Sequence, residues 1–165
     1  MTRLARKVSP AKWRTADWAS PERLPADAIS ADLRTTANTL SFWRADVEGH
    51  GDESAILALL GTMQRVEKID IAFVDDTLIE GAASQSTLGD TLVENLRDLH
   101  VDLVDLDHSL LIKTAFVIGR EIFASTTMRL TKAQVKGRLQ KAVNDGHLSW
   151  DTLPSDMQSE ITRPI

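Results

Sequence analysis

The stretch from Leu40 to Val74 changes its hydrophobic period twice, and this constrains the fold more than any other feature of the sequence. Residues 39–46 and 68–74 alternate with a period of two, which predicts a strand in each. Between them, apolar residues recur at helical spacing from Asp52 to about Val66. A strand, a helix and a strand in succession favour a crossover unit whose two strands run parallel.

Four further segments carry helical patterns: residues 25–34, 91–106, 107–123 and 131–145. The last has the strongest local signals, since Thr131 and Gln134 can form a capping box and Gly146 can end the helix. The sequence therefore predicts a helix-rich α+β fold, in which a small sheet with strands near 39–46 and 68–74 packs with about five helices.

The segment 91–106 allows two interpretations. As a strand, Val101 and Leu103 would share a face with Asp105, which breaks the apolar side. As a helix, its leucines recur at steps of four and three, and its carboxylates form a second stripe opposite them: Glu94, Asp98, Asp102 and Asp105. We expect an amphipathic helix with an acidic outer face, begun by Thr91 as N-cap.

The length and composition indicate one domain. A chain of 165 residues falls in the usual range for a single domain with a substantial core. We expect a globular body from residue 25 to 165 and a basic N-terminal arm, residues 1–24, that packs on this body through Trp13 and Trp18. All four tryptophans, which include Trp43 and Trp150, are either core residues or anchors for a partner.

Several classes of protein are disfavoured by composition. The chain has no cysteine, which excludes disulfides, thiolate nucleophiles and Cys-ligated zinc, and fits a reducing cytoplasm. No apolar run is long enough for a membrane span, and no apolar segment follows the basic amino terminus, so neither a membrane anchor nor a secretory signal is expected. No phosphate-binding, nucleophile-elbow or zincin motif is present, and no cofactor is expected.

Charge is segregated along the chain. From Asp46 to Asp107 there are fifteen acidic residues against three basic ones, whereas both flanks are basic. Uneven charge governs association rather than fold or reaction. It indicates an acidic surface that would attract a basic partner protein.

Paired carboxylates offer an alternative, enzymatic interpretation. Asp75 and Asp76 follow the strand 68–74, and carboxylates at a strand end can hold Mg²⁺ for hydrolysis or phosphoryl transfer, with His100 as base. The structural alternative is that they cap a turn into Thr77. His100 also belongs to a dense polar cluster with His108, but the spacing typical of paired metal-binding histidines is missing.

Nucleic-acid binding is a further alternative. The N-terminal arm contains five basic residues and no acidic one among them, and such an arm can contact phosphates: Arg3, Arg6, Lys7, Lys12 and Arg14. The competing interpretation is that these residues rest on the acidic middle of the chain or on a partner protein.

The sequence favours a non-catalytic interaction module, comparable to an immunity protein, an antitoxin or an accessory subunit. The expected binding surface is the acidic helical face of Glu94, Asp98, Asp102 and Asp105, because complementary charge speeds encounter and excludes wrong partners. The oligomeric state is left open.

Overall fold

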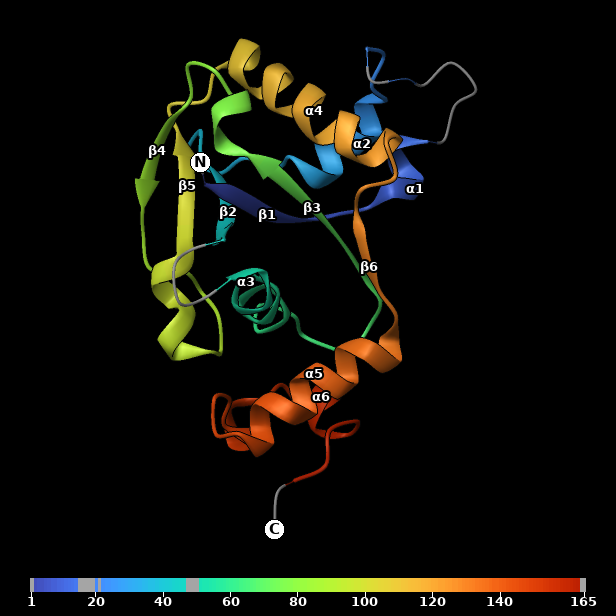
Figure 1. The fold of residues 1–165 in the computed structure, drawn as a ribbon, viewed down its shortest axis with the longest axis vertical. Coiled ribbons are helices and arrows are strands. Elements are labelled where there is room, and N and C mark those ends of the chain that lie inside the picture. The colour runs from blue at the N-terminus through green and yellow to red at the C-terminus, as the bar shows by residue number, and fades with distance from the viewer. Residues whose placement is uncertain (1, 15–19, 21, 47–50, 164–165) are drawn as a thin grey trace.

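Six strands form one antiparallel sheet at the centre of the molecule (Figure 1). The computed structural model describes residues 2–14, 20, 22–46 and 51–163. The strands are β1 (Arg3–Val8), β2 (Leu40–Ala45), β3 (Ile69–Asp75), β4 (Ala83–Ser86), β5 (His100–Val104) and β6 (Met128–Leu130). Their order is β4-β5-β2-β1-β3-β6, and every neighbouring pair is antiparallel. The fold is thus a single-domain α+β fold, as the sequence predicts.

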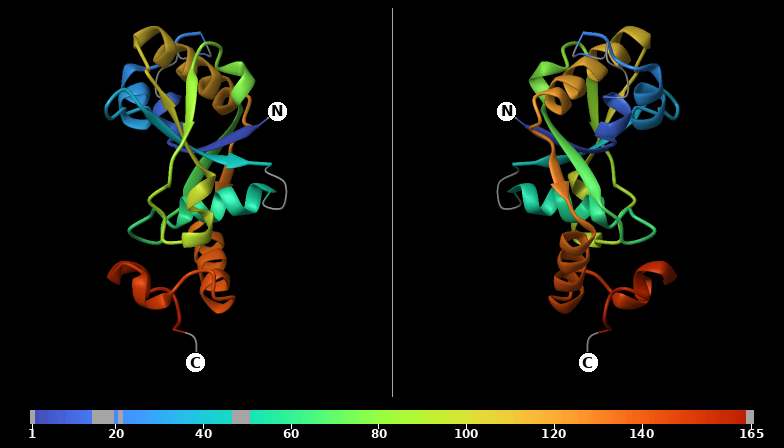
Figure 2. Two further views of the ribbon diagram at one scale, coloured as in Figure 1. Left: turned by 90° about the vertical axis from the view of Figure 1, so that its left-hand side faces the viewer. Right: turned by 90° about the vertical axis from the view of Figure 1, so that its right-hand side faces the viewer.

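Helices cover both faces of this sheet (Figure 2). On one face lie α3 (Gly51–Leu60), α5 (Lys132–Asn144) and α6 (Ser155–Gln158); on the other lie α1 (Pro10–Trp13), α2 (Ala26–Asp32) and α4 (His108–Phe123). Among the described residues, three 3₁₀ helices lie in the connections: η1 (Asp76–Leu78), η2 (Glu94–Leu99) and η3 (Trp150–Thr152). Each face carries its own apolar cluster, so the sheet is the middle of three layers. Within the described ranges, no helix is long and apolar enough to cross a membrane.

The strand-helix-strand unit predicted from Leu40 to Val74 is present. β2 and β3 are both antiparallel to β1, which lies between them, so they run in the same direction without touching. The connecting helix α3 is shorter than expected and ends at Leu60. The chain approaches Thr91 closely there, because a Cβ on Gly61 would lie 2.2 Å from the Thr91 hydroxyl oxygen.

The remaining helices expected at 25–34, 107–123 and 131–145 are confirmed as α2, α4 and α5. Asp107 caps α4 by accepting a hydrogen bond from the backbone N–H of Leu110 at 2.8 Å. The capping box of Thr131 and Gln134 is present at the start of α5, and Gly146 follows that helix with a positive φ of 76°.

The prediction of a helix over 91–106 was wrong. Residues 94–99 form the 3₁₀ helix η2, and His100–Val104 form β5, a strand paired with β2 on one side and β4 on the other. Val101 and Leu103 are buried on one face of the sheet. Asp105 takes a positive φ of 55°, so the extended backbone ends before it. Asp105 therefore does not break the apolar side of the strand. Thr91 is not an N-cap; its buried hydroxyl donates to the carbonyl of Ala58 at 2.8 Å.

Part of the segment expected as a basic N-terminal arm, residues 1–24, belongs to the central sheet. Residues 3–8 form β1, an interior strand that pairs with β2 and β3. Trp13, just beyond it, is fully buried, as expected for a residue that fixes this segment. Trp18 lies outside the described residues.

Basic flanks of the chain pair with its acidic middle. Within the part of the chain that the structure describes, five ion pairs connect the two: Arg3–Asp46, Arg3–Asp52, Lys7–Glu67, Arg129–Asp70 and Arg138–Glu53. Four of these pairs have both side chains partly exposed, and such pairs contribute about 0–1 kcal/mol each; in the fifth, Asp70 is buried. Their main consequence is that part of the segregated charge is neutralised within the fold.

Candidate functional site

Asp75 and Asp76 lie at the carboxyl end of β3, as predicted, but they have separate partners. Asp75 accepts hydrogen bonds from the hydroxyl of Thr77 at 2.8 Å and from its backbone N–H at 3.0 Å. These bonds lower the pKa of Asp75 below its usual value. Asp76 accepts a hydrogen bond from the backbone N–H of Thr2 at 3.3 Å. Asp75 therefore caps the turn into η1, which was the structural alternative to a metal site.

The structure does not bring His100 to these aspartates. His100 faces the α3 side of the sheet, next to Trp43, whereas Asp76 lines a pocket on the other side. Among the described residues there is no group of three or more His, Cys, Asp or Glu side chains placed to hold a metal ion. The predicted catalytic set of Asp75, Asp76 and His100 is thus not assembled.

His100 instead belongs to a hydrogen-bonded chain that the sequence did not reveal. Thr87 Oγ1 lies 2.7 Å from His100 Nδ1 and donates to Asp102 Oδ2 at 2.9 Å, while Ser41 donates to Asp102 Oδ1 at 2.7 Å. Because an ionised carboxylate only accepts, the Thr87 proton goes to Asp102, and His100 must donate its Nδ1–H to Thr87. Burial lowers the pKa of His100, and Asp102 opposes part of this effect. In its neutral form the imidazole therefore carries its proton on Nδ1.

The four residues of the predicted acidic face do not lie on one helix. Glu94 and Asp98 are exposed on η2, and Asp105 is exposed after β5. The side chain of Asp102 is only 16% exposed and is engaged by Ser41 and Thr87. A helical docking surface made of these carboxylates does not exist.

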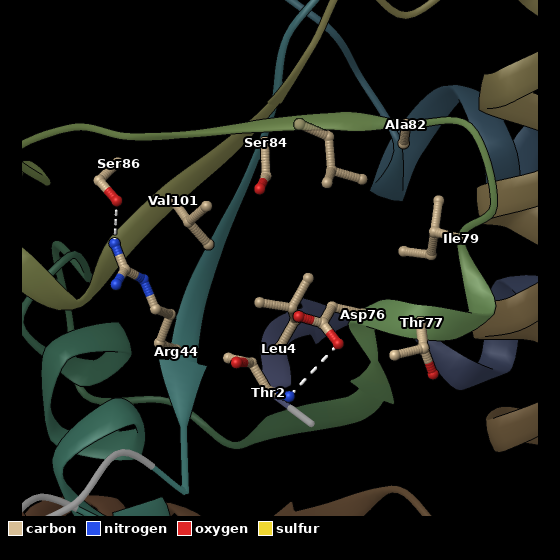
Figure 3. A pocket seen from close by; sticks show the side chains of 11 residues that line it. Thr2, Leu4, Arg44, Asp76, Thr77, Ile79, Ala82, Ser84, Ser86 and Val101 are labelled. Carbon is tan, nitrogen blue, oxygen red and sulfur yellow. Dashed lines mark hydrogen bonds between the residues drawn. The ribbon is translucent and has the colours of Figure 1, made fainter.

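A pocket of about 420 Å³ lies beneath β4, on the α4 side of the sheet (Figure 3). Its floor is apolar and comes from β1, β5 and the segment before β4: Leu4, Ile79, Ala82, Val101 and Leu103. Hydroxyl groups of Thr2, Thr77, Ser84 and Ser86 belong to its lining, with one cationic and one anionic side chain. An apolar floor with a few polar groups is typical of a ligand-binding pocket.

Arg44 supplies the cation of this pocket. It lies on the same strand face as Leu40 and Phe42, which are buried, and its guanidinium donates to the Ser86 hydroxyl. No carboxylate of the described residues forms an ion pair with it, in contrast to Arg3. A charged residue at a core-facing strand position was the sequence signal for this site.

The outer edge of β4 is open. β4 is the terminal strand of the sheet and pairs only with β5 among the strands in the described ranges; all four of its residues are exposed. Its sequence, Ala83-Ser84-Gln85-Ser86, has none of the charges or prolines that usually protect an edge strand. Leu78 before it is 54% exposed and Leu88 after it is 76% exposed.

The tryptophans of the described residues belong to the interior rather than to a docking surface. Trp13 and Trp43 are buried in the two clusters, and Trp150 is partly buried against the α3 side.

Comparison of the chain with protein-family models, with curated proteins and with solved structures found no match.

Proposed function

We propose that this protein is a non-catalytic interaction module that binds an extended, basic segment of a partner protein by adding it as a strand to the edge of β4. The observation that supports it is the open, uncharged edge of β4, with an exposed leucine before it in the chain, Leu78, and another after it, Leu88. Strand addition uses main-chain hydrogen bonds for affinity and side-chain contacts for specificity.

The backbone donors of β4 are arranged for this mode of binding. The backbone N–H of Thr87 donates to the carbonyl of His100, on the β5 side of the strand. In the register of β4 and β5, this pair of residues follows the pair of Ser86 and Val101. In an antiparallel pair, inward and outward groups alternate along a strand. The N–H groups of Ser84 and Ser86 therefore point outward, toward an added strand.

Charge selects a basic partner. The continuous segment 76–107, which contains β4, η2 and β5, has eight acidic residues and one basic residue, Arg97. Such an excess attracts Lys- and Arg-rich chains and speeds their association. It also disfavours pairing between two copies of the same edge, because like charges would be brought together.

The geometry gives less support to nucleic-acid binding. Three basic residues of the N-terminal segment are engaged within the fold: Arg3 and Lys7 pair with acidic side chains, and Arg6 is bound to backbone carbonyls.

For the module we propose the cytoplasm as its compartment, since a chain without cysteine fits a reducing environment.

Selection from a linear peptide library displayed on phage tests the proposal. We expect enriched peptides with Lys or Arg and with β-branched residues at alternate positions. Ser84→Pro removes one outward donor while leaving the inward ladder to β5 intact, and it should weaken a selected peptide by about tenfold or more in fluorescence polarisation.

Ser84→Ala is the matched control, because it removes the hydroxyl and keeps the amide; its affinity should equal that of the wild type. Peptides that bind Ser84→Pro as well as the wild type would contradict strand addition. Light scattering gives a second check, since a concentration-dependent dimer abolished by Ser84→Pro would assign this edge to self-association instead.

A further inference from the structure

The pocket beneath β4 presents opposite charges across a small space. Figure 3 shows Arg44 on one side of the pocket and Asp76 on the other, with Ser84 above them. Arg44 comes from the interior strand β2 and is partly exposed in the pocket; among the described residues its guanidinium donates to the Ser86 hydroxyl and has no carboxylate partner. An incoming anion would supply one through a charge-assisted, bidentate contact.

Asp76 is suited to the opposite group. Its carboxylate accepts one long hydrogen bond, from the backbone N–H of Thr2, and it is exposed at the pocket rim. A carboxylate has room for several donors. An ammonium group that enters the pocket can therefore use the remaining acceptor positions of Asp76, with the Thr77 hydroxyl nearby in the lining.

The apolar floor fixes the rest of the ligand. Leu4, Val101 and Leu103 are almost fully buried beneath the pocket, and Ile79 and Ala82 complete the floor. These side chains favour an aliphatic group. The volume of about 420 Å³ suits a molecule of the size of an amino acid or a dipeptide rather than a nucleotide with its long phosphate chain.

We infer that this pocket binds a small aliphatic zwitterion, whose carboxylate contacts Arg44 and whose ammonium contacts Asp76. Free amino acids and dipeptides share this chemistry. Binding in the pocket uses side chains on the sheet face, whereas docking at the edge of β4 uses outward backbone amides, so either can fail without the other.

Isothermal titration calorimetry with matched ligands tests the inference. The probes are leucine and leucyl-leucine, which carry both charges, 4-methylpentanoate, which has only the carboxylate, and 3-methylbutylamine, which has only the ammonium. We expect leucine or leucyl-leucine to bind, and the singly charged analogues to bind at least about tenfold more weakly. Whichever of the two binds more tightly shows whether the pocket fits a free amino acid or a dipeptide.

Variants locate the site. Arg44→Gln and Asp76→Asn should each weaken the zwitterion by about tenfold or more, whereas Arg34→Gln, at an exposed position outside the pocket lining, should not. Arg44→Lys keeps the charge and loses the planar fork, so it should retain part of the affinity. Amide chemical shifts in ¹H–¹⁵N NMR spectra should change at Ser84 and Thr77 on binding, and the same spectra verify that each variant is folded.

Two results would overturn the inference. One is the absence of any heat or chemical-shift change with both zwitterions up to about 10 mM, a concentration that would reveal even millimolar affinity. The other is equal binding of 4-methylpentanoate and leucine together with no effect of Asp76→Asn, because the pocket would then recognise an anion alone.

Discussion

Replacement of Asp32 should destabilise the fold more than replacement of any exposed carboxylate on the same helix. Asp32 is 9% exposed at the end of α2. Its carboxylate accepts from the backbone N–H of Ser9 at 2.6 Å and from the indole N–H of the buried Trp13 at 2.8 Å. Its main-chain carbonyl accepts from the guanidinium of Arg6 at 2.9 and 2.6 Å. Asp32 thus connects β1, α1 and α2.

The magnitude follows from the groups left behind. Asp32→Ala strands two donors, and each unsatisfied buried group costs about 1–3 kcal/mol. It also removes the carboxylate that offsets the burial of Arg6, whose pKa burial lowers to about 10. We expect the free energy of unfolding to fall by roughly 2–5 kcal/mol. For a chain of this size the melting temperature should fall by about 2–4 °C per kcal/mol.

Urea denaturation followed by tryptophan fluorescence measures this change. Asp27→Ala, at the exposed first turn of the same helix, is the control and should cost less than about 1 kcal/mol. Asp32→Asn keeps one acceptor oxygen without the charge and should fall between the two. Equal stability of the Asp32→Ala and Asp27→Ala variants would refute the role given to Asp32.

Two further predictions concern packing and pH. A Cβ on Gly89 would lie 2.3 Å from Trp43 Cη2, so Gly89→Ala should lower the free energy of unfolding in urea by about 1–3 kcal/mol. Gly137 on α5 has open space around it, so Gly137→Ala should raise that free energy by about 0.5–1 kcal/mol. The reverse order would contradict the packing. Burial lowers the pKa of His100 in the folded state, so the unfolded chain binds more protons than the folded chain as the pH falls through the usual histidine pKa of 6.5. The free energy of unfolding therefore decreases as the pH falls. His100→Gln should lose less stability than the wild type between neutral pH and mildly acidic pH, and parallel losses in thermal melts would show that His100 does not contribute.

The sequence predicted the elements whose local signals agree with their packing. The alternation of β3 and the capping box of α5 are both present in the structure. β1 was missed because charged Arg6 and Lys7 interrupt its apolar pattern; the fold accommodates Arg6 through the backbone carbonyl of Asp32 at the end of α2 and Lys7 through Glu67. These partners lie far along the chain, so a local pattern cannot show them.

β4 and β5 were missed for different reasons. β4 is exposed on all its residues, so no buried side imposes an alternation on its sequence. The pattern of β5 is only five residues long, and the leucines of η2 before it extend an apparent helical stripe into it. The positive φ of Asp105, which separates Leu106 from the strand, is a backbone feature that side-chain periodicity does not encode.

The candidate site was only partly visible in the sequence. Asp76 was singled out for its place after a strand, and it does line a pocket. Arg44 was placed correctly on a strand but received no role, although a charge on a core-facing position is a recognisable signal. The meeting of Arg44 with β4 depends on the pairing of β5 with both β2 and β4, which the sequence did not predict.

The pairing of β5 is the central claim, because both the open edge of β4 and the pocket beneath it depend on it. Nuclear Overhauser contacts in the free protein test it most directly. We expect cross-strand contacts between Trp43 and His100 and between Ser84 and Leu103, in the register of an antiparallel sheet. Sequential helical contacts through residues 91–106, without those cross-strand contacts, would contradict it.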